Sequence, residues 1–415
     1  MRLSTISLVM FALFAAPFLC ALEPVPAGAT QDLIEKKEQA EEKKSEEKKV
    51  EQTAEQAKEQ EKKEEKKEKP RNDYIIIPAI YYTPETSVAF GLSVLFYYRP
   101  PNQLIEKRPA VIQPTVIYTI KDQIILILGG ENYLDTDQKW YLFYRVEGSK
   151  YPDKFWGIGD NTPRWAEEDF TAWYGLIDIT ARYKVWGDLG IGLMYDFAGY
   201  DMRDMDEYTK GTDPEGRRVP SPLRSGTVPG SKGGYYNSLG PLLQYDSRDR
   251  VSWPSEGIYA TLSLLPYHEY TGSSADFYKG ELDFRWYYSI IEGHVFSLQW
   301  DTVLSEGDVP FTMMPKLGGR DKLRGLPEGR YRDRNMTLLQ LEMRIPVVWR
   351  FGAVFFASAG NVWDRFEDFH AERITYGGGL GVRLTVDKDE KVNARADLGI
   401  TREGWAIYFY LMEAF

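Results

Sequence analysis

Three histidines are the side chains of this 415-residue sequence best suited to acid–base catalysis near neutral pH. His268 ends a stretch with strand character, His294 follows a predicted turn, and His370 lies in an acidic stretch. We expect them at different ends of the fold, and no serine stands in the strand–turn–helix setting of a hydrolase nucleophile. The sequence therefore predicts no catalytic residues and no enzyme.

Acidic and glycine-rich stretches are the remaining candidates for chemistry. The carboxylates between 201 and 207 lack the glycine-centred spacing of a calcium loop, so we predict a solvated surface, with weak divalent bridging to lipopolysaccharide as the alternative. Gly377-Gly378-Gly379 precedes no helix that could bind phosphate, and small residues there are better suited to let another segment approach closely. We predict no metal site and no cofactor.

The first residues have the pattern of an export signal. Met1-Arg2 is positively charged, residues 6–19 are almost uninterruptedly apolar, and Leu19-Cys20-Ala21 resembles a signal-peptidase site. A lipoprotein is the alternative, but the bulky Leu19 precedes Cys20 where a small residue is expected. Cleavage after Ala21 would leave no cysteine, which excludes disulfides and thiol catalysis. We predict a signal peptide over 1–21.

Residues 22–73 form a predicted leader that is rich in Glu and Lys over 31–70. Its composition favours a solvated helix or a disordered spacer, and its few large apolar residues give no coiled-coil seam. A periplasmic rod that contacts the cell wall or a lipoprotein partner is the sharper alternative. The formal net charge is −11, and no nucleic-acid partner is predicted.

Residues 74–415 show alternation of apolar and polar side chains with period two, interrupted by turn residues. This pattern predicts sixteen strands of about the nine to eleven residues that cross a bilayer. They lie near 74–83, 86–98, 110–120, 123–133, 139–149, 171–184, 189–200, 234–246, 256–270, 276–290, 294–304, 334–346, 351–363, 374–385, 391–401 and 405–415.

The chemistry of the two strand faces distinguishes a membrane barrel from a soluble sandwich. Within 281–288 the apolar face alternates with Glu281, Asp283 and Arg285, and 339–345 and 392–400 behave alike. A sandwich has the same period, but export, the lack of cysteine, the aromatic strand ends and the terminal Phe415 favour a barrel. The long connections 150–170, 201–233 and 305–333 all follow odd-numbered strands, as expected if both ends of the barrel domain are periplasmic. We predict an all-β, sixteen-stranded antiparallel barrel, closed so that no edge lies in lipid.

Residues 318–333, which we call the arginine loop, interrupt the strand pattern with many arginines and glycines. Glycines permit tight bends, and arginines can meet buried acids. A solvated basic turn is the alternative. We expect the arginine loop to be a lid folded into the barrel.

Several motifs then resemble, in order, the BamA/TamA-like superfamily of outer-membrane barrels, the bacterial surface antigen type. Leu323-Arg324-Gly325-Leu326 resembles its lid motif, and the hairpin 245–257 resembles its D-x-R-D…P-x-x-G motif. The strands at 339–346, 352–362 and 376–383 resemble those that follow the lid. The resemblance implies hairpin residues Asp246, Arg248, Asp249, Pro254 and Gly257; lid contacts Glu342, Ser358, Gly360 and Arg383; and a barrel-assembly signal with Tyr408, Tyr410 and Phe415.

Two departures from the family pattern affect the expected function. Ser358 stands where the family usually has an Asp that contacts the lid arginine, which leaves Glu342 as the expected partner of Arg324. The leader also has no room for the family's POTRA domains, which capture clients. The resemblance therefore implies a member without POTRA domains.

The family resemblance implies a non-enzymatic scaffold for protein or lipid insertion or translocation, in the outer membrane of a Gram-negative bacterium. The expected partners are outer-membrane lipids, periplasmic or lipoprotein partners of the leader, and the assembly machinery that inserts the barrel itself. A passive or lid-gated pore, or a purely structural barrel, is the alternative.

Overall fold

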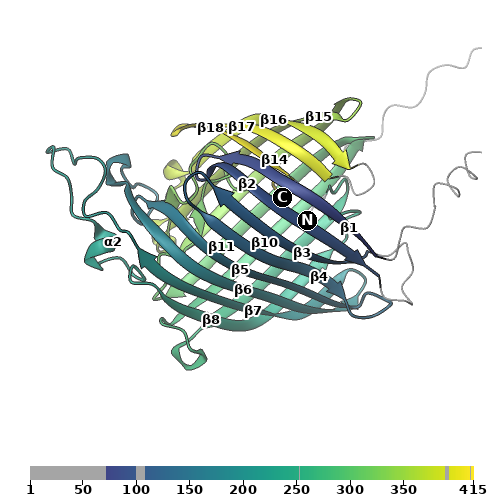
Figure 1. Cartoon of the computed structure of the whole chain (residues 1–415), viewed down its shortest axis with the longest axis horizontal. Helices are drawn as coiled ribbons and strands as arrows, with labels where there is room; N and C mark the ends of the chain where they lie inside the picture. Colours follow the sequence, from purple (N-terminus) through teal and green to yellow (C-terminus); the bar gives the residue numbers. More distant parts are fainter. Residues whose placement is uncertain (1–71, 100–107, 252, 388–391, 412) are drawn as a thin grey trace, which may run out of the picture. The chain divides into compact units, whose positions relative to one another are not determined.

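The computed structural model describes residues 72–99, 108–251, 253–387, 392–411 and 413–415. Sixteen antiparallel strands close into one barrel, in the order β1, β18, β17, β16, β15, β14, β11 and then β10 down to β2 (Figure 1). The strands are β1 (Asn72–Thr83), β2 (Ser87–Tyr98), β3 (Ala110–Thr119), β4 (Ile124–Tyr133), β5 (Trp140–Phe155), β6 (Glu168–Trp186), β7 (Leu189–Arg203), β8 (Gly234–Asp246), β9 (Gly257–Tyr267), β10 (Phe277–Ile291), β11 (His294–Gly307), β14 (Asn335–Val348), β15 (Phe351–Trp363), β16 (Thr375–Asp387), β17 (Val392–Thr401) and β18 (Gly404–Leu411). The predicted fold class and strand number are confirmed.

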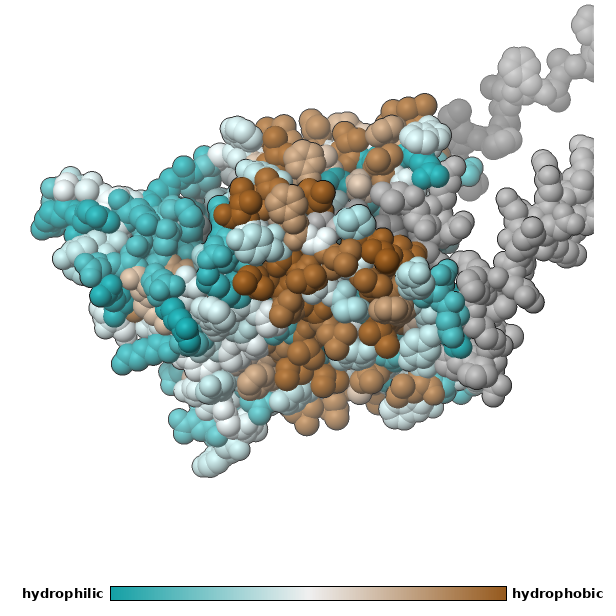
Figure 2. Space-filling model, viewed as in Figure 1, coloured by the Kyte–Doolittle hydropathy of each residue, from teal (hydrophilic) through white to brown (hydrophobic). Residues whose placement is uncertain are grey.

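The alternation read from the sequence separates an apolar outer face from a polar inner face. In β14, Leu339 is exposed on the outer face, whereas its neighbour Gln340 and the next inner residues, Glu342 and Arg344, are buried. Figure 2 shows the result as a band of hydrophobic side chains across the strands, with hydrophilic residues gathered at the loop end. Such a band fits the hydrocarbon of a membrane, because an apolar surface of this extent is unfavourable in water.

Strand ends are where the sequence prediction needs correction. β5 continues to Phe155, β6 already begins at Glu168, and β7 continues to Arg203, because hydrogen-bonded pairing extends past the point where the apolar alternation stops. At the loop ends of β5 and β6 the pairing continues past the apolar outer face, and the inward side chains Phe155 and Phe170 are buried. Asn72 and Asp73, assigned to the leader, begin β1; the rest of the predicted signal peptide and leader lies outside the described residues.

The three longest connections follow β5, β7 and β11, as the strand count predicted. The β7–β8 connection contains the short helix α2 (Pro222–Ser225), which begins after the capping Ser221 and ends at Gly226, where φ is +78° (Figure 1). The helices in the described part of the chain are all too short or too polar to cross a membrane. The β11–β14 connection contains the arginine loop and a two-stranded ribbon of β12 (Lys316–Leu317) and β13 (Tyr331–Arg332).

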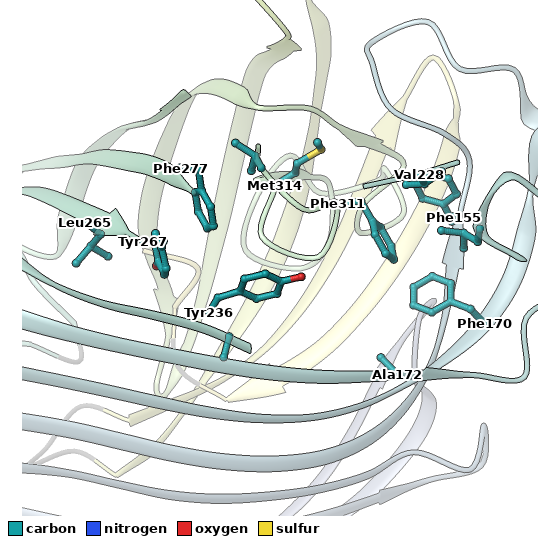
Figure 3. Close-up of a cluster of buried hydrophobic side chains, with 13 residues drawn as sticks. Phe155, Phe170, Ala172, Val228, Tyr236, Leu265, Tyr267, Phe277, Phe311 and Met314 are labelled. Atoms are coloured by element: carbon teal, nitrogen blue, oxygen red, sulfur yellow. The ribbon is translucent and has the colours of Figure 1, made fainter. Parts of the chain in front are cut away.

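A cluster of buried apolar side chains gathers on the inner face near the loops. Phe311 of the β11–β14 connection packs edge-on against Phe155 and Phe170 at the loop ends of β5 and β6 (Figure 3). Val228 from the β7–β8 connection joins the same cluster. Two long connections are therefore held against the barrel wall by apolar packing.

Candidate functional site

The arginine loop reaches the barrel wall through a fully buried arginine, Arg324. Its Nη2 donates to Oε1 of Glu342 on β14 at 2.5 Å, and its Nη1 donates to Oδ2 of Asp397 on β17 at 2.7 Å. The guanidinium carbon lies 3.5 Å from the ring centre of Phe356 on β15. Burial alone would lower the pKa of Arg324, but the two carboxylates hold it above its ordinary value. Arg324 thus joins the arginine loop to three strands.

Glycines on both sides of this contact allow the main chains to approach. Gly325 has φ of +101°, and a Cβ at this position would lie 2.7 Å from the carbonyl carbon of Gly399 on β17. A Cβ at Gly399 would lie 2.5 Å from the carbonyl carbon of Arg324. The N–H of Gly325 donates to the hydroxyl of Tyr408 on β18 at 3.1 Å. Even one methyl group at either glycine would displace the arginine loop.

Apolar side chains of the arginine loop complete the contact. Leu323 and Leu326 have no exposed surface and pack in one cluster with inner residues of β11, β14 and β15. Leu323 adopts a left-handed conformation with φ of +42°, which is unfavourable for a branched side chain. The buried packing and the ion pairs compensate for this strain.

The two acids that bind Arg324 belong to a larger chain of buried charges. Glu342 also accepts from Arg344 at 3.1 Å, and Asp397 accepts from Arg383 at 2.5 Å. Arg383 in turn donates to Glu413 at 2.7 Å. Each charge has a counter-charge within hydrogen-bond distance, which is the condition under which buried ions are tolerated.

The structure brings Arg324 and the predicted partner Glu342 together. Ser358 acts through Gln340, since its hydroxyl and the N–H of Leu323 both donate to the Gln340 side-chain oxygen, at 3.1 and 3.3 Å. A Cβ at Gly360 would lie 2.8 Å from Leu317, just before the arginine loop. Arg383 contacts Arg324 only indirectly, because it donates to Asp397, which also accepts from Arg324.

Asp397 is the contact that sequence reasoning missed. Ser358 on β15 cannot supply a carboxylate, and Asp397, two strands away on β17, lies against Arg324 instead. The available signal was its inner-face position within the alternation of 392–400. No local pattern could show that the arginine loop would reach that strand.

The predicted hairpin motif forms a compact turn between β8 and β9. Asp246 pairs with Arg248 at 2.9 Å, and Asp249 accepts from the N–H and the hydroxyl of Ser255. Although burial raises it, these hydrogen bonds bring the pKa of Asp249 below its ordinary value. Gly257 has φ of +109°, and a Cβ there would lie 2.4 Å from the carbonyl oxygen of Ser247.

The carbonyl oxygen of Pro254, in the same hairpin, accepts from Arg344 at 3.4 Å, which links the hairpin to the charge network.

The end of the described chain departs from the prediction. β18 ends at Leu411, not at Phe415, and Phe415 is buried near Tyr287 on β10 and Val295 on β11. Its main-chain oxygen accepts from Arg344 at 3.0 Å. Phe415 is therefore not a strand-terminal aromatic on the outer face, because Arg344 and this apolar cluster hold it inside. Tyr408 and Tyr410 do lie in β18, and Tyr410 packs edge-on against Tyr81 of β1.

The histidines and acidic stretches do not form a reactive cluster. His268 lies at the loop end of β9, and His294 begins β11 at the opposite end of the barrel. His370 lies in the β15–β16 connection. Within the part of the chain that the structure describes, no three His, Cys, Asp or Glu side chains are placed to hold a metal ion.

The stability of the barrel should depend on pH through Asp333, at the end of the arginine loop. Burial raises its pKa from 3.8 to about 6, and the nearby Asp364 adds to the rise. The folded state then binds a proton more tightly than the unfolded state, so the free energy of unfolding falls as the pH rises from about 4 to about 6. Asp333→Asn should raise it at pH 8 by up to about 3 kcal/mol, and much less at pH 4.

Urea denaturation at both pH values measures this difference. The exposed Asp137→Asn serves as the matched control and should change the free energy of unfolding by less than about 0.5 kcal/mol. An equal gain for Asp333→Asn at pH 4 and pH 8 would show that ionisation of Asp333 plays no part.

Comparison with known proteins finds one matching domain and several similar barrels. Residues 212–387 match the Omp85 superfamily domain. The fold is similar to BamA from Haemophilus ducreyi lacking POTRA domains 1–3 (TM-score 0.54, 14% identity), with 83% of this chain and 71% of that chain covered. It is also similar to CdiB from Escherichia coli (TM-score 0.52, 11% identity, 83% and 67% covered) and to CdiB from Acinetobacter baumannii (TM-score 0.50, 10% identity, 82% and 59% covered).

A comparison with curated proteins gives no match. At such low identities the similar structures establish the fold alone. The domain match covers the β7–β8 connection through β16, which includes the arginine loop and its partner Glu342. Residues 212–387 therefore match the Omp85 superfamily domain, and the barrel that contains them has a fold similar to those of BamA and CdiB.

Proposed function

We propose that this chain is a non-enzymatic scaffold that assists proteins or lipids to insert into, or cross, the outer membrane of a Gram-negative bacterium. The observation that carries the proposal is the weak junction between β1 and β18. β1 pairs with β2 along its whole length, from Asn72 opposite Tyr98 to Thr83 opposite Ser87. Among the described residues, β1 and β18 are in register only where Tyr82 lies opposite Phe409.

Unpaired strand edges supply the chemistry for such a role. N–H and C=O groups along β1 and β18 that do not pair with each other can pair with an incoming strand. In a membrane these groups have no water to bond, so a client that satisfies them is stabilised at this junction. The barrel needs no bond-making residues for this activity.

The length of β18 supports the same role. β18 has eight residues, fewer than the roughly nine to eleven that a tilted strand needs to cross the hydrocarbon. A short strand at the junction favours a locally thinner bilayer. Thinning lowers the barrier for a polar or partly folded client, and the junction then serves as a lateral opening.

The arginine loop is the proposed latch of this scaffold. Arg324 connects β14 on one side with β17, the immediate neighbour of β18, on the other. Gly325 bonds directly to Tyr408 of β18. The arginine loop thus holds the β18 side of the junction through Gly325, and it reaches the turn between β1 and β2 through the N–H of Glu328, which donates to Glu85 at 2.9 Å.

A disulfide across the junction tests the proposal. Tyr82→Cys with Phe409→Cys places two cysteines opposite each other, in a chain whose single natural cysteine is Cys20. In proteoliposomes, the oxidised variant should insert a denatured outer-membrane barrel at least about tenfold more slowly than wild type, measured as protease-protected client, and reductant should restore the rate.

The matched control is Leu92→Cys with Val116→Cys, a register pair between β2 and β3 on the same outer face. This cross-link should leave the insertion rate unchanged. Full insertion activity in the oxidised β1–β18 variant, or none in wild type, contradicts the proposed function.

A further inference from the structure

Arg332, in β13, is a buried cation without a carboxylate partner. It is 1% exposed, its Nη2 donates to the main-chain oxygen of Lys154 at 3.3 Å, and its Nε has no partner. Among the described residues it forms no salt bridge. An arginine stays protonated throughout the physiological pH range, so a full positive charge is enclosed here, and the carboxylates of Asp153 and Glu328 act on it only from beyond salt-bridge distance.

Aromatic rings are the main surroundings of this guanidinium. Its carbon lies 5.4 Å from the ring centre of Phe155 and 5.5 Å from that of Phe311. Figure 3 shows these two rings close together in the buried apolar cluster. Ring faces attract a cation but carry no net charge, so they do not neutralise Arg332.

Arg332 lines a cavity of about 310 Å³ between the β11–β14 connection and strands β1 to β7. This volume is at the lower end of the range for small-molecule sites. Each other charged side chain that lines the cavity has a partner, and Lys316 is shared by Asp153 and Glu328. These contacts are Arg145 with Glu147, Lys316 with Asp153, Arg320 with Asp321, and Glu85 with the N–H of Glu328. Among the described residues that line the cavity, Arg332 is therefore the cation that has no carboxylate within salt-bridge distance.

The wall of the cavity on the barrel side is unusually apolar for a lumen. In β4, Ile124, Leu126 and Leu128 are exposed on the outer face, yet the inner residues Ile125 and Ile127 are also apolar. The inner residues Ile117 of β3 and Leu176 of β6 extend this surface. Inner faces of membrane barrels are normally polar. Here Ile117 and Ile125 pack in one buried cluster with Tyr81 and Ala89, and the same isoleucines line the cavity.

We propose that this cavity binds a small amphipathic anion, with one carboxylate or phosphate on Arg332 and an apolar body against Ile117, Ile125 and Leu176. The planar guanidinium can donate two parallel hydrogen bonds to either anion. The apolar wall excludes water from the rest of the ligand and adds affinity in proportion to the buried area. A fatty carboxylate and a phosphate monoester with a short alkyl chain share this chemistry.

Calorimetric titration of the purified barrel in amphipol with hexyl phosphate tests the site. Wild type should bind one molecule with saturation, and Arg332→Gln should weaken binding at least about tenfold, the loss expected for hydrogen bonds to a charged group. Inorganic phosphate and hexanol, titrated separately, should each bind at least about tenfold more weakly than hexyl phosphate. Arg365→Gln, on an exposed arginine of the β15–β16 connection, is the matched control and should bind as wild type does.

A second variant tests the apolar half while Arg332 stays in place. Leu176→Trp fills the cavity from β6 and should also abolish saturable binding, and a heat-shift gel verifies that each variant is folded. The proposal is overturned if wild type shows no saturable binding, if Arg332→Gln binds as wild type does, or if Leu176→Trp leaves the affinity unchanged. Inorganic phosphate binding as tightly as hexyl phosphate would also overturn it, because a free anion site needs no apolar wall.

Discussion

Arg324→Ala should lower the free energy of unfolding of the barrel by about 3–5 kcal/mol, because it leaves the buried carboxylates of Glu342 and Asp397 without their shared cation. The remaining partners, Arg344 and Arg383, each neutralise one acid only in part. We expect a lower yield of folded barrel and a lower temperature at which the band shifts on a semi-native gel. Insertion activity per folded molecule should be measured separately from stability, because we assign Arg324 a structural role and no catalytic step.

Two further variants show whether the loss comes from the ion pair. Arg365→Ala removes an exposed arginine and should change stability by less than about 0.5 kcal/mol. Combining Arg324→Ala with Glu342→Gln should cost less than the sum of the two single changes, with a coupling of about 0.5–3 kcal/mol. An unchanged heat shift in Arg324→Ala would exclude a structural role for this arginine.

Most of the barrel wall could be predicted because the signal is local. Outward apolar side chains alternate with inward polar side chains along each strand, and turn residues interrupt this alternation between strands. Each strand can therefore be identified from its own residues. The strands at 234–246 and 351–363 were predicted to the residue. At the loop ends of β5 and β6 the inward Phe155 and Phe170 pack against a long connection, and the alternation disappears while the pairing continues. The predicted strands were therefore too short there.

The charge network was less predictable because it depends on how the strands are arranged around the barrel. Glu342 follows the arginine loop closely in sequence and could be paired with Arg324 by pattern. Asp397 lies 73 residues from Arg324 and reaches it only because β14 to β17 are neighbours in the ring. Phe415 was misplaced for the same reason, since its position depends on Arg344 and on strands β10 and β11 rather than on its own strand.

The alternation of apolar and polar side chains could not predict the cavity at Arg332. The alternation identifies which side chains point inward, but it does not report whether an inward charge has a partner. The continuous apolar run Ile124-Ile125-Leu126-Ile127-Leu128 was visible in the sequence and departs from the alternation of its neighbours. Such a departure in a membrane barrel indicates a place where the inner face meets something other than water.

Deletion of residues 311–333 should raise the single-channel conductance in planar bilayers on the order of tenfold, because sixteen-stranded barrels without an internal plug enclose an aqueous channel. The β11–β14 connection contacts nearly opposite walls of the ring. Phe311 and Arg332 lie against the rings of β5 and β6, whereas Arg324 binds β14 and β17. A segment that touches both walls must cross the lumen between them, which is why its removal should open a path for ions.

The size of this increase decides between the two candidate functions. Deletion of the exposed turn Asp213–Arg217 in the β7–β8 connection is the matched control and should leave conductance low. If wild type is already a large, selective channel and inserts no client, the chain is a pore and the insertion scaffold is wrong. If the 311–333 deletion conducts no more than wild type although it is folded, the arginine loop does not close the lumen. Low wild-type conductance, a large rise on deletion and retained client insertion would together show that the arginine loop seals the barrel while the β1–β18 junction does the work of insertion.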